Sequence, residues 1–286
     1  MTVYMVFAII LASDYANMRK MKIMTRHEVK CIIEKYRITI GRWIIRGNGL
    51  IDVDGSCEIS HSEFSRLPLH FGTVTGNFYC HSNNLTSLKG CPDYVGGDFI
   101  CYGNNLKALK YAPIEVGGNF SCHENNLKNL KGCPRHIKGN FNCFLNQITT
   151  LVDGPNRVEG SYYVYLNELI SLKGSPVHIG GSFNVSGNRI RNLVCCPEYI
   201  GEFFSFDNTV SIFMNQQNCA VKEIEIQIQD QICEPEFFLP QVIIDNKKYL
   251  PIIFKYNRYL ELFSEDMVFN DVNFNDIVLD IKEGLR

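Results

Sequence analysis

A repeat of 21 residues runs through most of this chain and constrains its fold more than any other feature. Asparagine recurs at this spacing without a slip, and proline does the same nine residues later in each repeat. The asparagines are Asn83, Asn104, Asn125, Asn146, Asn167 and Asn188, and the prolines are Pro92, Pro113, Pro134, Pro155, Pro176 and Pro197. A fixed period of about 20 to 30 residues is typical of a solenoid, in which each repeat buries its apolar face against the next one.

One repeat reads G-x-F-x-C-x-x-N-x-L-x-x-L-x-x-x-P-x-x-V-G. Phe78 and Cys80 occupy alternate positions of a short strand, and Asn83 can bond to backbone groups that the turning chain leaves unpaired. A rung of this length has no room for a full helix on its return side, where we expect extended or 3₁₀ backbone. The fold class predicted is a β-rich solenoid with parallel strands on a concave face and a non-helical convex side.

The sequence divides into four parts, of which one is the repeat region. Residues 1–24 form an N-terminal extension. Its apolar stretch, Met1 to Ala12, is shorter than the ~20 residues of a membrane span and lacks the basic start of a signal peptide, and Met21 and Met24 are alternative starting points. Residues 25–50 predict a small helical and hairpin N-terminal cap, because Thr25 and Glu28 have the spacing of a capping box. The solenoid is expected over 51–209, and 210–286 is expected to be an α+β C-terminal cap, with helices near 256–263 and 275–284.

The twelve cysteines predict a reduced core rather than disulfides or a metal site. Four of them, Cys80, Cys101, Cys122 and Cys143, occupy one inward strand position that valine takes in the next two repeats, so they behave as small hydrophobic residues. Adjacent Cys and His residues on a strand point to opposite faces and cannot chelate one ion together. No cofactor or metal is expected. Free thiols in this number favour a reducing compartment, and hence the cytoplasm.

Aromatic side chains on the outward strand positions are the strongest functional signal. The alternation of the strand sends these side chains to the concave face, where repeat solenoids usually bind partners. The candidate binding residues are Tyr79, His81, Tyr102, His123, Phe144, Tyr163 and Tyr165. Leu145 and Leu166 widen the apolar area beside two of them. The alternative is that these rings pack across neighbouring strands and only stiffen the sheet.

The repeat GNFYCHSNNLTSLKGCPDYVGG and the lead-in GLIDVDGSCEISHSEFSRLPLHFGTVTGNF resemble short leucine-rich-repeat proteins of bacteriophages and some bacteria. The resemblance covers roughly residues 25–210, and Val164 and Val185 depart from the repeat at the cysteine position. It implies a leucine-rich-repeat fold and an interaction role, in the host cytoplasm if the chain is viral.

Two classes of function remain open at the level of sequence. The first is a non-catalytic interaction protein that binds a host or viral protein. The second is the substrate-recognition part of an effector enzyme such as a ubiquitin ligase, for which Cys219 and Cys233 are the only candidate nucleophiles in the C-terminal region, and acidic residues surround them. Nucleic acid is not expected as a partner, because no Lys or Arg lies between the aromatic residues, and a membrane is not expected either. The oligomeric state is open.

Overall fold

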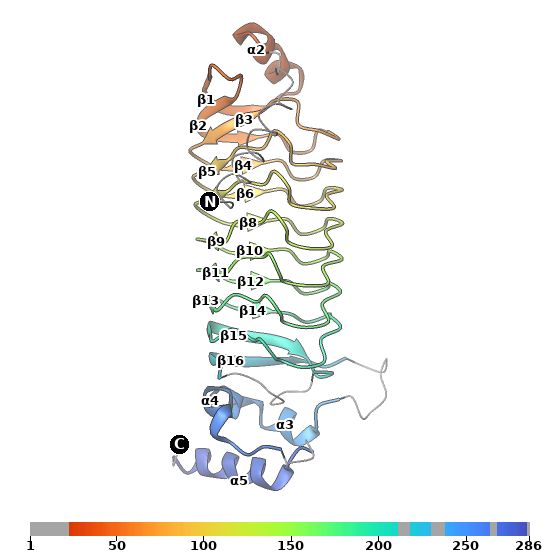
Figure 1. The fold of residues 1–286 in the computed structure, drawn as a ribbon, viewed down its shortest axis with the longest axis vertical. Coiled ribbons are helices and arrows are strands. Elements are labelled where there is room, and N and C mark those ends of the chain that lie inside the picture. The colour runs from red at the N-terminus through yellow and green to blue at the C-terminus, as the bar shows by residue number, and fades with distance from the viewer. Residues whose placement is uncertain (1–22, 211–217, 230–237, 264–267, 285–286) are drawn as a thin grey trace, which may run out of the picture.

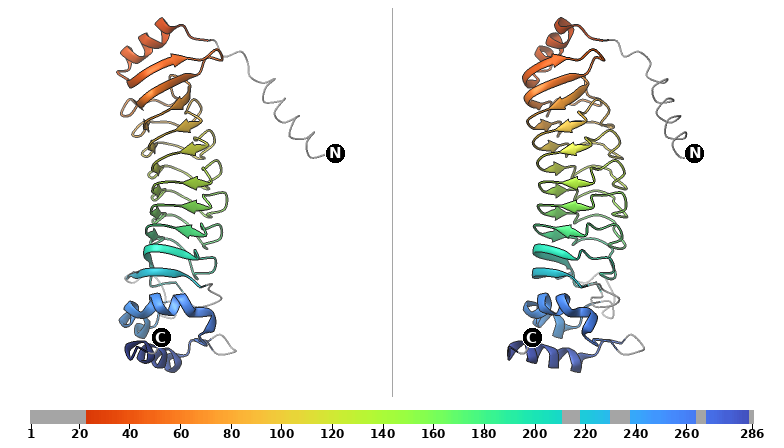
Figure 2. Two further views of the ribbon diagram at one scale, coloured as in Figure 1. Left: turned by 90° about the vertical axis from the view of Figure 1, so that its left-hand side faces the viewer. Right: turned by 60° about the vertical axis from the view of Figure 1, so that its left-hand side comes forward.

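The computed structural model describes residues 23–210, 218–229, 238–263 and 268–284. It is a parallel β-solenoid that runs as a nearly straight column, with a helix and hairpin at one end and a group of helices at the other (Figures 1 and 2). The predicted β-rich solenoid is therefore confirmed. The expectations for the apolar extension fall almost entirely on residues 1–22, which lie outside the described residues.

Each rung contributes one short strand to each of two parallel ladders. The first ladder contains β4 (Phe78–Tyr79), β6 (Phe99–Ile100), β8 (Phe120–Ser121), β10 (Phe141–Asn142), β12 (Tyr162–Tyr163) and β14 (Phe183–Asn184). The second contains β5 (Tyr94–Val95), β7 (Glu115–Val116), β9 (His136–Ile137), β11 (Arg157–Val158) and β13 (His178–Ile179). The return side is thus extended backbone rather than helix, as the short repeat predicts. Glycine pairs form the corner between the two ladders in three rungs, at residues 96–97, 117–118 and 180–181, and a Cβ on Gly117 would clash with the carbonyl oxygen of Gly96.

Long strands join the two ladders at both ends of the column. At the N-terminal end, β2 (Ile51–Glu58) pairs with β4 and with β3 (Phe71–Val74), which leads into the second ladder. At the C-terminal end, β15 (Tyr199–Asp207) pairs with both β13 and β14. The column therefore begins and ends on continuous strands.

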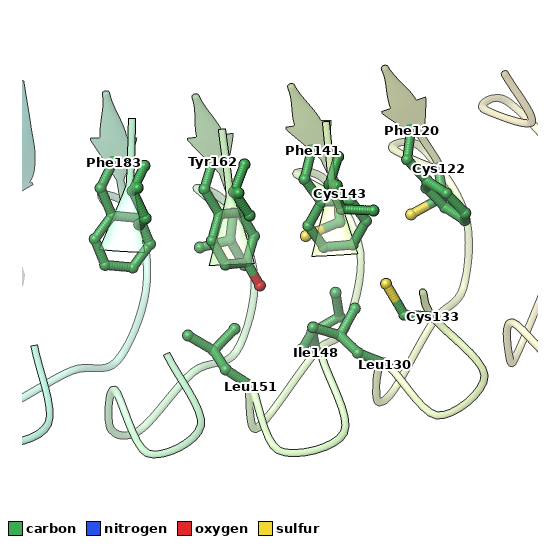
Figure 3. Packing of buried hydrophobic residues seen from close by; sticks show 14 of the residues in the cluster. Phe120, Cys122, Leu130, Cys133, Phe141, Cys143, Ile148, Leu151, Tyr162 and Phe183 are labelled. Carbon is green, nitrogen blue, oxygen red and sulfur yellow. The ribbon is translucent and has the colours of Figure 1, made fainter. Parts of the chain in front are cut away.

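The core is a set of buried columns, in which each rung places the same side-chain type above the last (Figure 3). Phe120, Phe141, Tyr162 and Phe183 are fully buried, and neighbouring rings lie 5.1 to 5.5 Å apart. The thiols of Cys80, Cys101, Cys122 and Cys143 form a second buried column. The inward position predicted for this column is confirmed by its complete burial, and the eleven cysteines in the described residues are free thiols.

The repeating asparagine ties each rung to its neighbours. Nδ2 of Asn104 donates to the carbonyl oxygens of Cys80 in the preceding rung (3.0 Å) and of Cys101 in its own rung (3.1 Å). Its Oδ1 accepts from the backbone N–H of Leu85 (2.9 Å). The same pattern recurs down the column, which confirms that asparagine satisfies the backbone groups of the turn.

The N-terminal cap contains the predicted helix and hairpin. Helix α2 (Arg26–Lys35) begins at Thr25, whose side chain accepts from the N–H of Glu28 (3.2 Å) while the Glu28 carboxylate accepts from the N–H of Thr25 (2.8 Å). Strand β1 (Thr39–Ile45) then pairs antiparallel with β2.

The C-terminal segment differs from the sequence expectation in detail. Strand β16 (Ala220–Gln227) stacks in parallel on β15, so it continues the column past residue 209. Helices follow, namely α3 (Gln241–Asp245), η2 (Lys247–Tyr249), α4 (Leu250–Tyr256), η3 (Asn257–Tyr259) and α5 (Asp271–Lys282).

The helix expected near residues 256–263 is wrong. The α-helix there ends at Tyr256, and only the short η3 follows it before the chain becomes extended at Leu260. The preceding apolar run forms the helix instead, because Leu250, Ile253 and Phe254 bury one face at the i, i+3, i+4 spacing. The helix expected near 275–284 overlaps α5, which begins earlier, at Asp271, and ends at Lys282.

Candidate interaction surface

Five of the predicted binding residues form one continuous stack, which we call the aromatic ladder. They lie two residues after the strands of the first ladder and are spaced one repeat apart. Their side chains point outward, whereas the residue before each of them, a cysteine in four of the five rungs, points into the core. The members are His81, Tyr102, His123, Phe144 and Tyr165. Successive ring centroids are 4.5, 4.4, 4.3 and 4.5 Å apart, and the planes differ by only 8° to 14°.

A residue that sequence reasoning missed contacts the end of the stack. His61 contacts His81 edge to face, with centroids 5.0 Å apart. It precedes His81 by 20 residues rather than 21, so a strict period does not find it. At the other end Ser186 replaces the aromatic residue, and its hydroxyl donates to Oδ1 of Asn184 (2.7 Å).

Tyr79 and Tyr163 do not belong to this stack. They occupy the neighbouring outward column, four repeats apart, so they do not contact each other. The hydroxyl of Tyr79 accepts from Nδ2 of Asn77 (2.7 Å). The ring of Tyr79 also contacts His81 edge to face, with centroids 6.3 Å apart, so the structure brings together six of the seven predicted residues, five of them in the stack.

Stacking changes what the surface can offer a partner. Each inner ring of the aromatic ladder has both faces covered by its neighbours, and all five side chains are half-buried. Cross-strand packing of the rings is thus present, and a partner meets ring edges rather than open faces. The strands that bear the aromatic ladder follow a nearly straight column rather than the concave arc expected from the sequence (Figure 2).

Two leucines beside the ladder are both exposed and held in an unusual backbone conformation. Leu145 is 43% exposed and Leu166 is 49% exposed, and each has a φ of 52°. The left-handed region is costly for leucine because its Cβ crowds the carbonyl oxygen. The same position in other repeats also has a positive φ, whether it holds glycine (Gly103 and Gly187) or a residue with a Cβ (Ser82 and Glu124).

The aromatic ladder is uncharged at neutral pH. Burial lowers the pKa of His81, and the neighbouring His61 lowers it further. Burial also lowers the pKa of His123, although the carboxylate of Glu124 partly opposes this shift. Burial raises the pKa of Tyr165. The strip therefore presents neutral ring edges and two aliphatic side chains.

The sequence raised a metal cluster and a nucleophilic cysteine as candidate chemistry. No group of three or more His, Cys, Asp or Glu side chains there is placed to hold a metal ion. Cys219 is fully buried, and its pKa is raised by a hydrogen bond with Cys196 and by burial, which opposes formation of a nucleophilic thiolate. Cys233, the other candidate nucleophile, lies outside the described residues.

A carboxylate on the second ladder is held by two basic side chains. Glu159 accepts from Arg157 (2.7 Å) and contacts Nε2 of His136 (2.8 Å), and these hydrogen bonds lower the pKa of Glu159 to about 2. The group is exposed and ion-paired, which is the arrangement of a surface salt bridge.

Among the described helices, none has the length and apolar character needed to cross a bilayer. Comparison with known proteins finds no matching family model, no matching curated protein and no matching solved structure.

Proposed function

We propose that this chain is a non-catalytic protein-interaction module whose partner binds over the aromatic ladder at the rungs of Phe144 and Tyr165. The observation that carries the proposal is the pair of exposed leucines, Leu145 and Leu166, in left-handed backbone. They extend the neutral strip outward at two successive rungs.

Two separate costs oppose leucine at these positions. A left-handed conformation costs about 1 kcal/mol or more for a residue with a Cβ, and two of the six repeats use glycine at this position, Gly103 and Gly187. Exposure of the side chain to water forgoes the stabilisation that burial of a leucine provides. Ser82 and Glu124 take the same backbone conformation, so what sets Leu145 and Leu166 apart is the exposure of two large apolar side chains, which burial against a partner would relieve.

The neighbouring rings suit such a contact. Aromatic residues are enriched at the centres of protein interfaces, and the stacked rings hold their geometry before binding. Phe144 and Tyr165 stack at 4.5 Å directly beside the two leucines. A preordered apolar strip loses little side-chain entropy when a partner covers it.

The partner proposed is another protein in a reducing compartment. The free thiols favour the cytoplasm, since disulfides persist mainly in oxidising compartments. The resemblance to phage-type leucine-rich-repeat proteins favours a host or viral protein as the partner, with the chain acting in the host cytoplasm.

The test replaces both leucines with glycine, in the double variant L145G/L166G. Glycine relieves the positive φ but makes the unfolded chain more flexible, so we expect the free energy of unfolding to stay within about 1 kcal/mol of the wild type. Quantitative affinity capture from native cells, with mass spectrometry of the bound proteins, should show at least a tenfold loss of the specific partner, because interface anchors commonly contribute about 2 kcal/mol each.

The matched control removes two exposed aliphatic side chains elsewhere, in the variant I114S/V177S. Ile114 and Val177 are exposed just before strands of the second ladder. This variant should retain partner capture. Equal capture by the wild type and by a folded L145G/L166G variant would contradict the proposal.

A further inference from the structure

A second surface of the column is strongly basic, and we call it the lysine strip. It lies on three successive turn segments, 84–92, 105–113 and 126–134, that follow the asparagine column. These segments contain five lysines and no aspartate or glutamate: Lys89, Lys107, Lys110, Lys128 and Lys131. Acidic side chains return on both sides, at Glu63 one repeat before Asn84 and at Asp153 in the following turn segment.

The charges of the lysine strip are not neutralised within the described residues. All five lysines are exposed, and none of them pairs with a carboxylate in that part of the chain. Other basic residues on the column do find partners, for example Lys138 with Glu115 at 3.4 Å and Arg157 with Glu159 at 2.7 Å. The strip is thus a concentrated and uncompensated positive field.

The backbone of the lysine strip is held firmly. The N–H of Lys89 donates to the hydroxyl of Ser87 (3.2 Å), and the N–H of Lys131 donates to Oδ1 of Asn129 (3.1 Å). Because adjacent rungs are roughly 4.8 Å apart, the three rungs place their ammonium groups within a strip about 10 Å long. Side chains on one face of an extended peptide repeat at about 6.8 Å, so two or three carboxylates of such a peptide can pair with the strip.

We infer that the lysine strip binds an acidic, extended segment of a protein partner. This surface is separate from the aromatic ladder, and the inference does not rest on the ladder's role. Nucleic acid fits less well, because the whole chain has a net charge of −2 and an isoelectric point near 6.4, whereas nucleic-acid-binding domains are usually strongly basic. The one exposed aromatic ring on these turns, Tyr111, has the ammonium of Lys110 4.9 Å from its centroid rather than an open platform for bases.

The experiment measures fluorescence anisotropy of labelled deca-glutamate with the full chain at roughly 25 mM and roughly 150 mM sodium chloride. We expect binding that weakens with salt. The variant K107Q/K110Q/K128Q/K131Q should lose roughly fourfold or more in affinity at low salt, since each exposed ion pair contributes a factor of roughly 1.4 to 5. Because the four positions are exposed, we expect the glutamine variant to fold as the wild type does, and circular dichroism checks this.

The control variant K30Q/K222Q/K247Q/K255Q removes the same number of charges from exposed positions off the strip and should bind as the wild type does. No binding by the wild type at low salt, or an equal loss in both variants, would overturn the inference. A second ligand, a ten-nucleotide oligothymidine, tests nucleic acid as the partner. If the wild type binds it more tightly than deca-glutamate, and the lysine-strip variant does not bind it, the inference is overturned and the lysine strip is a phosphate-binding surface.

Discussion

At position 162 a tyrosine occupies the buried column that holds phenylalanine in the rungs on either side, Phe141 and Phe183. Its hydroxyl oxygen finds no hydrogen-bond partner among the described nitrogen and oxygen atoms. The thiol of Cys143 lies nearby, but sulfur is a weak partner, and burial raises the pKa of Tyr162 well above its usual value. The 21-residue period correctly predicts that Tyr162 is in the core. Whether its hydroxyl has a hydrogen-bond partner depends on the neighbouring side chains, which the period does not specify.

We expect Tyr162→Phe to stabilise the protein by about 1 kcal/mol, because it removes a buried polar atom that lost its water without gaining a full hydrogen bond. Urea unfolding monitored by circular dichroism measures the change in the free energy of unfolding. Tyr163→Phe, on the half-buried outward position next to it, serves as the control and should change stability by less than about 0.5 kcal/mol. A Tyr162→Phe variant that is clearly destabilised would mean that the hydroxyl has a partner, such as a buried water.

The candidate surface shows the same limit of sequence reasoning at the scale of single residues. Strand alternation and the period predict correctly that His81, Tyr102, His123, Phe144 and Tyr165 share one outward column. They do not predict that the rings stack face to face, because side-chain rotation is not part of the pattern. The positive φ of the leucines has a signal only in retrospect, in the glycines that take the same place at Gly103 and Gly187.

At the scale of elements, the aromatic ladder links several histidines whose protonation affects its stability. His61, His81 and His123 lie in or against the stack, and burial lowers the pKa of His81 and His123 below the usual 6.5. The folded state therefore binds fewer protons than the unfolded state once the pH falls to about 6.5. The free energy of unfolding is fully retained above that value and is lost progressively as the pH falls toward the lower folded pKa values.

We expect the melting temperature of the wild type to drop between about pH 7.5 and about pH 5.5, and the variant H81F/H123F to drop distinctly less. Phenylalanine keeps the stack, as Phe144 does, and removes two groups whose protonation opposes folding. Part of the drop should persist, because burial and Lys89 also lower the pKa of His70. Tyr165→Phe is the control, since it removes no group that titrates in this range. Identical dependence of the melting temperature on pH for the wild type and H81F/H123F would show that protonation of these two histidines does not affect the stability of the protein.

At the scale of the whole molecule, a column of rungs that contact only their neighbours is stable because its ends are closed. The capping box and hairpin of the N-terminal end could be predicted from residues 25–50, since their signals are local in the chain. The additional rung β16 could not, because it stacks on β15 without the asparagine or proline of the repeat. The helical end is harder still, since short apolar runs such as Leu250–Phe254 suit a strand or a helix until their packing partner is known.

The closed column predicts which cysteines react in the native protein. Cys31 and Cys195 are exposed, whereas the other nine described cysteines are buried. Alkylation with iodoacetamide, followed by peptide mass spectrometry without reductant, should modify Cys31 and Cys195 rapidly. The buried thiols should react only after opening, because they are inaccessible and burial raises the pKa of thiols such as Cys101 and Cys122, which suppresses the reactive thiolate.

The order of labelling in increasing urea then tests how the column opens. Rungs of a solenoid depend on their neighbours, so fraying should begin at the ends, and Cys57 and Cys219 should be labelled before Cys101 and Cys122 in the middle. Simultaneous labelling of all buried thiols would mean that the column unfolds in one cooperative step. Native labelling of Cys122 as fast as Cys31 would contradict the packed thiol column, and a disulfide among these cysteines would remove the argument for a reducing compartment.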